Sequence, residues 1–186
     1  FYRGLELYND SDYFGSASMF EKALKEPKDP IITARSAFWK AESEYNLEDY
    51  KNALLSYQQF SDLAKAKETA EFKNINYNIA YANFKLKEYD AAGNSFQSQI
   101  DNNKADKVRL NDSYLRLADC RFVTTKYQSA LDAYIEVIES KGVDADYAYF
   151  QKANSYGFVG KNDKKIEDLN SFLQTYLKSS YRDDAW

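Results

Sequence analysis

Apolar positions recur along the chain with the spacing of α-helices. Between Tyr50 and Phe60 they return every three or four residues, which places them on one helical face. The preceding stretch, from about Thr33 to Leu47, lacks proline and glycine and carries apolar residues of its own. A polar break at Asn46–Asp49 separates the two stretches. The pattern predicts two helices joined by a short turn.

This two-helix pattern repeats along the whole chain. A small residue recurs in the first helix of each unit, at spacings of 37, 39, 38 and 35 residues: Gly4, Ala41, Ala80, Ala118 and Ala153. The second helix carries another small residue, at Ser16, Ala53, Ala92 and Ala130, and a ring four residues later, at Phe20, Tyr57, Phe96 and Tyr134. Small residues let neighbouring helices approach closely, while the rings fill the adjacent grooves. These ladders predict stacked helical pairs with a shared interior.

Composition supports helices and narrows the chemistry. Proline and glycine total only eight residues, too few for many short strands with tight turns, and we expect helix-to-helix connections to need neither. With no histidine and one cysteine, the chain lacks His-dependent nucleophiles, His-ligated metal sites and internal disulfides. The net charge of −4 disfavours nucleic acid as a partner. The chain contains no run of 18 apolar residues, so we expect no direct membrane span in this segment. We predict no catalytic, cofactor or metal site and no enzymatic activity.

The repeats resemble the tetratricopeptide repeat (TPR) family. That family combines a small residue, three spacers and an aromatic residue in the second helix of each repeat, as in Ala53-x₃-Tyr57 and Ala130-x₃-Tyr134. The fifth unit departs from the pattern, with Lys165-x₃-Leu169. The resemblance implies an all-α fold, a right-handed α-solenoid of about five hairpins and the start of a sixth. The approximate units are 1–30, 31–67, 68–106, 107–143, 144–178 and 179–186 of one solenoid segment, expected to be part of a longer chain.

The last residues are similar to a run that opens repeats in bacterial envelope TPR proteins. Tyr176, Ser179, Tyr181 and Ala185 match that run, although Leu177 stands where the family has proline. Such proteins include the lipoprotein subunit of the outer-membrane β-barrel assembly machine and the periplasmic Tol–Pal coordinator. This similarity implies a periplasmic or outer-membrane-associated protein, with a cytoplasmic location left open.

In TPR proteins one face of each first helix lines a concave groove, and that resemblance implies a partner surface here. The candidate residues are Phe38, Glu42, Tyr77, Tyr81, Lys85, Leu115, Asp119, Tyr147, Phe150 and Asn154. They would offer an aromatic groove, capable of hydrogen bonding, to a peptide or partner protein. The alternative for the rings is packing between helices, which we favour for Tyr45, Phe84 and Phe122. No pair of basic residues on this face matches the family's carboxylate clamp.

The expected function is a non-catalytic protein-interaction scaffold in a bacterial cell-envelope assembly. The alternative is a regulatory or spacing module of a larger enzyme, sensor or transcriptional regulator. We interpret the acidic cluster Glu42, Glu44, Glu48 and Asp49 as a solvated face, because surface charges on solenoids are usually solvated. Cys120 is expected to pack in the interior.

Overall fold

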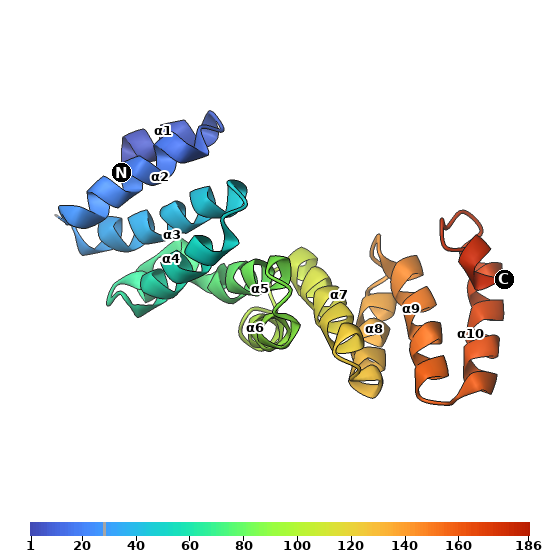
Figure 1. Ribbon diagram of the computed structural model, residues 1–186. Coiled ribbons are helices and arrows are strands. Elements are labelled where there is room, and N and C mark those ends of the chain that lie inside the picture. The colour runs from blue at the N-terminus through green and yellow to red at the C-terminus, as the bar shows by residue number, and fades with distance from the viewer. Residues whose placement is uncertain (28) are drawn as a thin grey trace. The chain divides into compact units, whose positions relative to one another are not determined.

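The computed structural model describes residues 1–27 and 29–186, which form ten α-helices and no β-strand (Figure 1). The all-α prediction is therefore confirmed. The helices gather into two compact units, Phe1–Glu88 and Tyr89–Trp186. Lys28, in a segment that we expected to link two repeats, lies outside the described residues. The continuity of all repeats in one array remains a prediction.

The first unit contains five helices. They are α1 (Tyr2–Asn9), α2 (Tyr13–Lys25), α3 (Pro30–Asn46), α4 (Tyr50–Asp62) and α5 (Ile75–Lys85). Each helix packs against the next one in the chain. Two short 3₁₀ turns, Ala66–Glu68 and Ala70–Asn74, connect α4 to α5, and Ala66 is fully buried. The extra residues between these repeats therefore help to close the core.

The second unit contains the other five helices and a C-terminal turn. The helices are α6 (Tyr89–Asn102), α7 (Lys107–Val123), α8 (Tyr127–Ser140), α9 (Ala145–Phe158) and α10 (Asn162–Thr175). Consecutive helices again pack together, and a 3₁₀ turn follows at Asp183–Ala185.

The predicted ladders form the interior of both units. All of the small ladder residues named above are buried, and so are the four ladder rings. At Gly4 the helices approach so closely that a Cβ atom would lie 2.8 Å from the Phe20 ring. Nearby, the Ser16 hydroxyl donates to the Gly4 carbonyl over 3.0 Å. The small residues thus set the separation of the helices, as the pattern predicts.

Rings at the ends of the hairpins repeat the same contact. Tyr8 and Tyr13 have centroids 5.3 Å apart, and the equivalent pair Tyr45 and Tyr50 lies 5.2 Å apart. In the second unit, Phe122 meets Tyr127 at 5.3 Å. All three pairs are edge-to-face, the arrangement that aromatic quadrupoles favour. Tyr45 and Phe122 therefore do pack between the helices of their own hairpins.

Five turns with one hydrogen-bonding pattern end the first helices of the repeats. In the turn after α3, the Glu48 N–H donates to the Tyr45 carbonyl and the Asp49 N–H to the Glu44 carbonyl. This is the Schellman arrangement, which satisfies carbonyls at a helix end. The turn requires a left-handed residue, found at Ser11, Glu48, Lys87, Thr125 and Gly160, with φ between 61° and 75°.

Only one of these five left-handed positions is glycine, the residue that the conformation favours. Our expectation that helix-to-helix connections need no glycine is confirmed in four of the five turns. The turns do need a positive φ, and four of them place an ordinary residue there despite the steric cost. In two of the turns the next residue, Asp12 or Asp49, accepts a backbone N–H from the following helix and so caps it.

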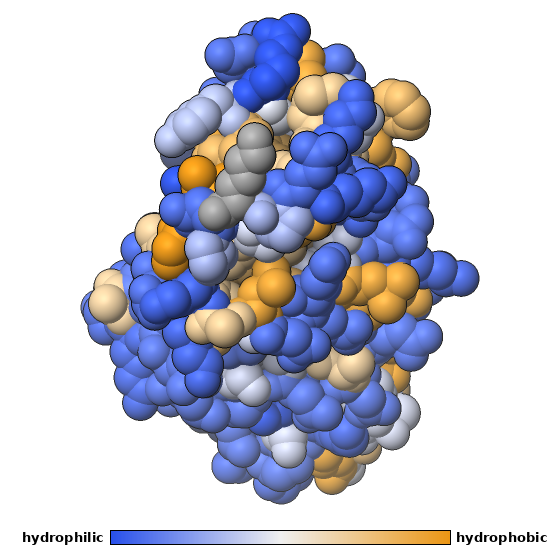
Figure 2. All heavy atoms as spheres, turned by 90° about the vertical axis from the view of Figure 1, so that its left-hand side faces the viewer, coloured by the Kyte–Doolittle hydropathy of each residue, from blue (hydrophilic) through white to orange (hydrophobic). Residues whose placement is uncertain are grey.

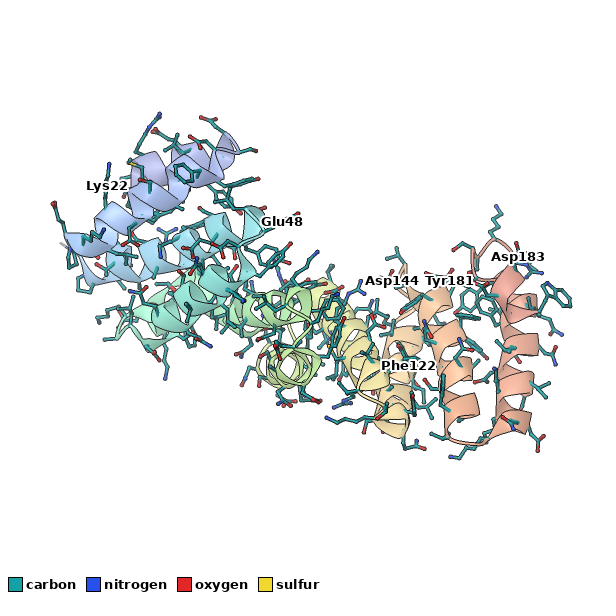
Figure 3. All side chains as sticks on the ribbon, in the orientation of Figure 1. Lys22, Glu48, Phe122, Asp144, Tyr181 and Asp183 are labelled. Atoms are coloured by element: carbon teal, nitrogen blue, oxygen red, sulfur yellow. The ribbon has the colours of Figure 1, made fainter. Side chains whose placement is uncertain are left out.

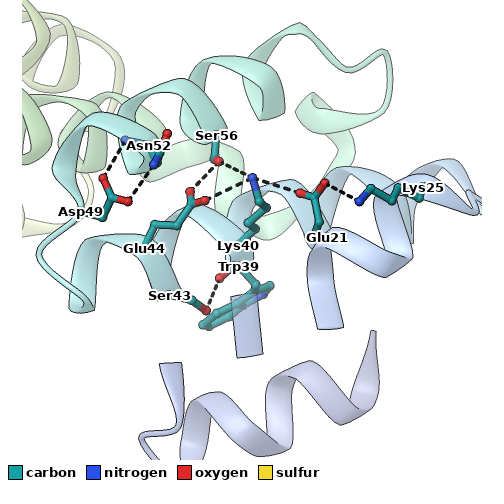
Figure 4. Close-up of polar contacts among 9 residues, drawn as sticks. All are labelled: Glu21, Lys25, Trp39, Lys40, Ser43, Glu44, Asp49, Asn52 and Ser56. Atoms are coloured by element: carbon teal, nitrogen blue, oxygen red, sulfur yellow. Dashed lines mark hydrogen bonds and ion pairs between the residues drawn. The ribbon is translucent and has the colours of Figure 1, made fainter. Parts of the chain in front are cut away.

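A polar network joins three helices of the first unit (Figure 4). The Lys40 ammonium of α3 lies 3.2 Å from Glu21 of α2 and 3.2 Å from Glu44. It also donates to Ser56 of α4, whose hydroxyl donates to Glu44 over 2.6 Å. Burial acts to lower the Lys40 pKa, but the two carboxylates outweigh it and the pKa is raised. Glu44 is therefore a packed ion-pair partner, contrary to the solvated face that we expected.

Figure 2 shows the face of the molecule at its N-terminal end. Hydrophilic residues cover most of it, and hydrophobic residues appear as small separate groups. Scattered apolar groups of this kind are ordinary on folded proteins. On this face, the hydrophobic groups are therefore too small and separate to form a broad apolar binding patch.

Candidate functional site

A pocket of about 250 Å³ opens on the first unit. Two first helices of repeats and one second helix build it: α3, α5 and α4, respectively. Its lining consists of Glu42, Tyr45, Tyr57, Tyr77, Asn78 and Tyr81, and we call it the Glu42 pocket. The structure thus brings together three of the ten predicted groove residues, Glu42, Tyr77 and Tyr81.

The Glu42 carboxylate is fixed by two neutral donors. The Tyr57 hydroxyl and the Asn78 amide both donate to Glu42 Oε1, each over 2.5 Å. Burial, followed by the Glu42 charge, raises the pKa of Tyr57 well above its ordinary value. The phenol therefore stays protonated and remains a donor. Glu42 is partly buried and positioned from two sides, so it too differs from the solvated face that we expected.

Tyrosine rings form the walls around this carboxylate. Tyr77 and Tyr81 lie one helical turn apart on α5, and their centroids meet edge-to-face at 4.9 Å. Tyr45 lines the pocket from α3, and burial raises its pKa to about 12. The predicted residue Lys85 is exposed and does not line the pocket, and its ammonium lies 5.9 Å from the centroid of the Tyr50 ring. The pocket therefore combines an anionic group with several π faces.

Two predicted groove residues lie in the interior instead. Phe38 is 7% exposed, and its ring contacts Trp39, Tyr57 and Phe60 at centroid distances of 5.4–5.9 Å. Leu115 is 1% exposed. Both occupy the same repeat position as Tyr77, three residues before the small ladder residue. Packing leaves them almost no surface for a partner, so we remove both from the candidate surface.

The second unit holds a related but closed carboxylate site. Asp119 Oδ1 accepts from the Tyr134 hydroxyl over 2.9 Å and from the Tyr147 hydroxyl over 3.0 Å. Arg116 donates to Asp119 Oδ2 over 2.9 Å. Burial raises the pKa of Asp119, although these three donors oppose the shift. Asp119 is 9% exposed, so its carboxylate interacts mainly with other side chains of this protein.

The chain's own C-terminal segment covers the remaining rings of the predicted groove. Tyr181 stacks on Phe150 at 5.5 Å with an angle of 15° between the rings, and it contacts Tyr147 at 5.4 Å. Figure 3 shows Tyr181 beside α9 and α10. Asn154 is partly exposed on α9. On this unit, the predicted face is thus occupied by a tyrosine of the same chain.

Sequence reasoning missed Tyr57, Asn78 and Tyr134, although the sequence contained a signal for the two tyrosines. The residue after the first small ladder residue is acidic in only two repeats, at Glu42 and Asp119. The buried ladder ring is a tyrosine in those same repeats and phenylalanine in the first and third, whereas the fifth repeat has the partly buried Leu169 at this position. A buried carboxylate needs a donor, and the phenol supplies it. This pairing within single repeats could have identified both contacts.

Among the described residues, His, Cys, Asp and Glu side chains form no group of three that could hold a metal ion. Of the helices within residues 1–27 and 29–186, none combines the length and apolar character needed to cross a bilayer.

Comparison with known proteins identifies the fold. No protein-family model matches the sequence, and no curated protein does either. The solved structure of MamA matches with a TM-score of 0.74 and 21% identity, over 94% of this chain and 95% of that chain. YrrB, described as a TPR protein with an unusual peptide-binding site, matches with a TM-score of 0.74 and 16% identity, over 92% and 81%.

A larger protein shares the same architecture. The structure of a Rap protein complexed with Competence and Sporulation Factor matches with a TM-score of 0.55 and 17% identity, over 94% of this chain and 52% of that chain. These similarities show that the chain has a TPR-like repeat fold, which confirms the predicted fold class. At these identities they establish the fold alone.

Proposed function

We propose that this chain is a non-catalytic protein-interaction scaffold that binds a peptide or a peptide segment of a partner protein. The observation that carries the proposal is the Glu42 pocket, where Tyr77 and Tyr81 remain partly exposed beside a positioned carboxylate. Rigid rings provide large contact area at low entropic cost, and fixed polar groups provide specificity.

The second unit supports this use of the predicted face. There, Tyr181, from the segment that follows α10, packs its ring against Phe150 and Tyr147. A segment of a partner would engage the first unit by the same kind of contact, inserting a side chain between rings. The solved YrrB and Rap structures, described with a peptide-binding site and with a bound factor respectively, provide precedents on this fold.

Selection from a random 12-residue peptide display library tests the proposal. We expect selected peptides to bind the chain and to lose at least tenfold in affinity when Tyr77 and Tyr81 are both replaced by alanine. The matched control replaces Tyr2 and Phe14, which are 72% and 78% exposed on the same unit and outside the pocket. Equal affinity of the selected peptides for both double variants would refute the Glu42 pocket as the binding site.

For the setting, we propose a bacterial cell-envelope assembly. The support is the tail pattern, whose residues make the contacts that dock the C-terminal segment. The Ser179 hydroxyl donates to Asp146 over 2.6 Å, Tyr181 stacks on Phe150, and Ala185 is buried. Fractionation of the native cells with an antiserum tests this setting. Recovery in the cytoplasmic fraction would instead favour a regulatory or spacing module of an enzyme, sensor or transcriptional regulator.

A further inference from the structure

We propose that a pocket on the second unit binds a phosphate group, either as inorganic phosphate or as the terminal phosphate of a small soluble ester. The pocket has a volume of about 250 Å³ and lies between α6, α7 and the start of α8. We call it the Arg121 pocket. It shares no lining residue with the Glu42 pocket, and the inference does not depend on the proposed function.

The first argument is a positive charge that is already positioned. Arg121 lines the pocket from α7, where Figure 3 labels the next residue, Phe122. The guanidinium donates to the side-chain oxygen of Gln97 over 2.8 Å and to the carbonyl of Ser129 over 3.2 Å. Both acceptors are neutral, and no carboxylate among the described residues forms an ion pair with Arg121. The planar fork keeps further N–H donors for charge-assisted bonds to an oxyanion.

The second argument is the set of donors around this guanidinium. Lys126 and Ser129 line the pocket from the start of α8, and Asn94 lines it from α6. The Lys126 ammonium pairs with Asp90 over 2.6 Å, but the two side chains are 58% and 69% exposed, so the pair contributes little stability. A ligand can therefore share or take over this ammonium. With two cations and one carboxylate, the lining carries a net positive charge.

The third argument comes from the same position in other repeats. Asp12 and Asp49 precede α2 and α4, and each accepts a backbone N–H three residues later. Lys126 precedes α8 with a similar backbone conformation but provides no side-chain cap. The corresponding N–H, that of Ser129, meets no acceptor within the described part of the chain. Two repeats thus supply a carboxylate oxygen where this repeat supplies positive charge, and a bound oxyanion would provide the missing oxygen.

The fourth argument concerns the size and shape of the ligand. A volume of about 250 Å³ lies below the range of about 300–1,000 Å³ that is usual for drug-sized ligands. It has room for a phosphate group and part of its ester. A tetrahedral phosphate presents oxygens on several sides, so Arg121, Lys126 and Ser129 could each bind a different one. A planar carboxylate offers fewer oxygens and less charge, and we expect it to bind more weakly.

The test titrates small anions into the full chain. Inorganic phosphate and glycerol 3-phosphate are added at constant ionic strength, while the Ser129 amide and the Arg121 Nε–H signals are followed by NMR. Acetate is the planar control. We expect saturable shifts with millimolar dissociation constants for both phosphate probes, and at least fivefold weaker binding of acetate. Vesicles that contain phosphatidic acid test a lipid headgroup as the source, and we expect them to sediment no more protein than neutral vesicles do.

Three variants identify the charges that act in the pocket. Arg121→Gln should weaken phosphate binding at least tenfold. Lys104→Gln removes an exposed cation outside the pocket and should leave binding unchanged. Asp90→Asn removes the carboxylate that competes for Lys126, so it should strengthen binding about threefold. Circular dichroism and thermal unfolding verify that the variants are folded.

Lys126→Asp separates ligand binding from a structural role. The new carboxylate can accept the Ser129 N–H, as Asp12 and Asp49 accept theirs in the first unit. We therefore expect phosphate binding to be lost while thermal stability is retained or raised. The proposal would be overturned by phosphate shifts that do not saturate, by equal binding of acetate and phosphate, or by unchanged binding in Arg121→Gln or Lys126→Asp. Binding to the phosphatidic acid vesicles without binding of the soluble probes would overturn the soluble ligand.

Discussion

Replacing Gln99 with leucine should stabilise the protein. Gln99 lies on α6 and is 1% exposed, and neither polar atom of its side chain finds a hydrogen-bond partner within the described structure. In the repeat register its position corresponds to Phe60, Val137 and Phe172, all fully buried apolar residues. An amide therefore occupies a place that the fold otherwise fills with hydrocarbon.

The magnitude follows from two terms. Burying an amide without a partner costs about 1–3 kcal/mol in mutational data, and this cost disappears with the substitution. Ordering a glutamine side chain also costs about 1 kcal/mol more than ordering leucine. Leucine does not match the shape of the space that glutamine fills, and this imperfect packing lowers the stability by about 1 kcal/mol. The net expectation is a gain of about 1–3 kcal/mol, equivalent to a rise in Tm of about 2–4 °C for each kcal/mol.

Urea unfolding followed by circular dichroism at 222 nm measures the effect. A shift of the midpoint at constant slope reports stability alone, which matters because repeat proteins can unfold in more than one step. Gln99→Met, which has nearly the same shape, should also stabilise. Gln128→Leu, at an exposed position of α8, should change stability by less than about 0.5 kcal/mol. An unchanged or lower stability of both Gln99 variants would show that the buried amide is satisfied, for example by water.

Three further predictions concern the second unit. Lys161, the N-cap residue of α10, has a backbone conformation close to that of Asp12 and Asp49, but its side chain does not cap the helix. Lys161→Asp should therefore add about 1 kcal/mol to the free energy of unfolding measured in urea, and a loss of stability would contradict this prediction. Because burial raises the pKa of Asp119, the folded protein binds the carboxyl proton of Asp119 more tightly than the unfolded chain does. The free energy of unfolding should therefore fall as the pH rises from about 4, the ordinary pKa of aspartate, toward the raised pKa of Asp119. The stability of wild type relative to Asp119→Asn should therefore decline over that window, and a constant or growing difference in urea unfolding at several pH values would refute the assignment. Cys120 is 1% exposed and burial raises its pKa to about 12, so Ellman's reagent at pH 8 should label it only after unfolding, and rapid labelling of the folded protein would refute its burial.

The ladders could be predicted because they depend on spacing alone. A small residue that recurs in register, such as Ala41 or Ala118, must face a neighbouring helix wherever the repeats stack. The buried position of Cys120 beside that ladder followed from the same periodicity and is confirmed. Local pattern was sufficient for these features because every repeat solves the same packing problem with its immediate neighbours.

The candidate site could be predicted only in part, because its residues share repeat positions with residues that pack inside. Phe38 and Tyr77 occupy the same position, yet Phe38 is enclosed by Trp39 and Phe60 while Tyr77 lines an open pocket. The difference lies in the side chains that surround each position, which periodicity does not encode. The left-handed turns escaped prediction for a different reason. Residues such as Glu48 and Thr125 give no local sign that they will adopt a positive φ.

The Lys40 network has a consequence for the way the first unit opens. In an ordinary repeat array each helix couples only to its nearest neighbours, so a terminal hairpin can fray while the rest stays folded. Lys40 on α3 holds Glu21 of α2 and Ser56 of α4 at the same time, so detaching α2 leaves an ammonium that is 20% exposed without one of its two counter-charges. Fraying of the first hairpin is thereby coupled to loosening of the second. Amide protons of α2 and α4 should consequently exchange with solvent as one cooperative unit rather than as a gradient from the N-terminal end.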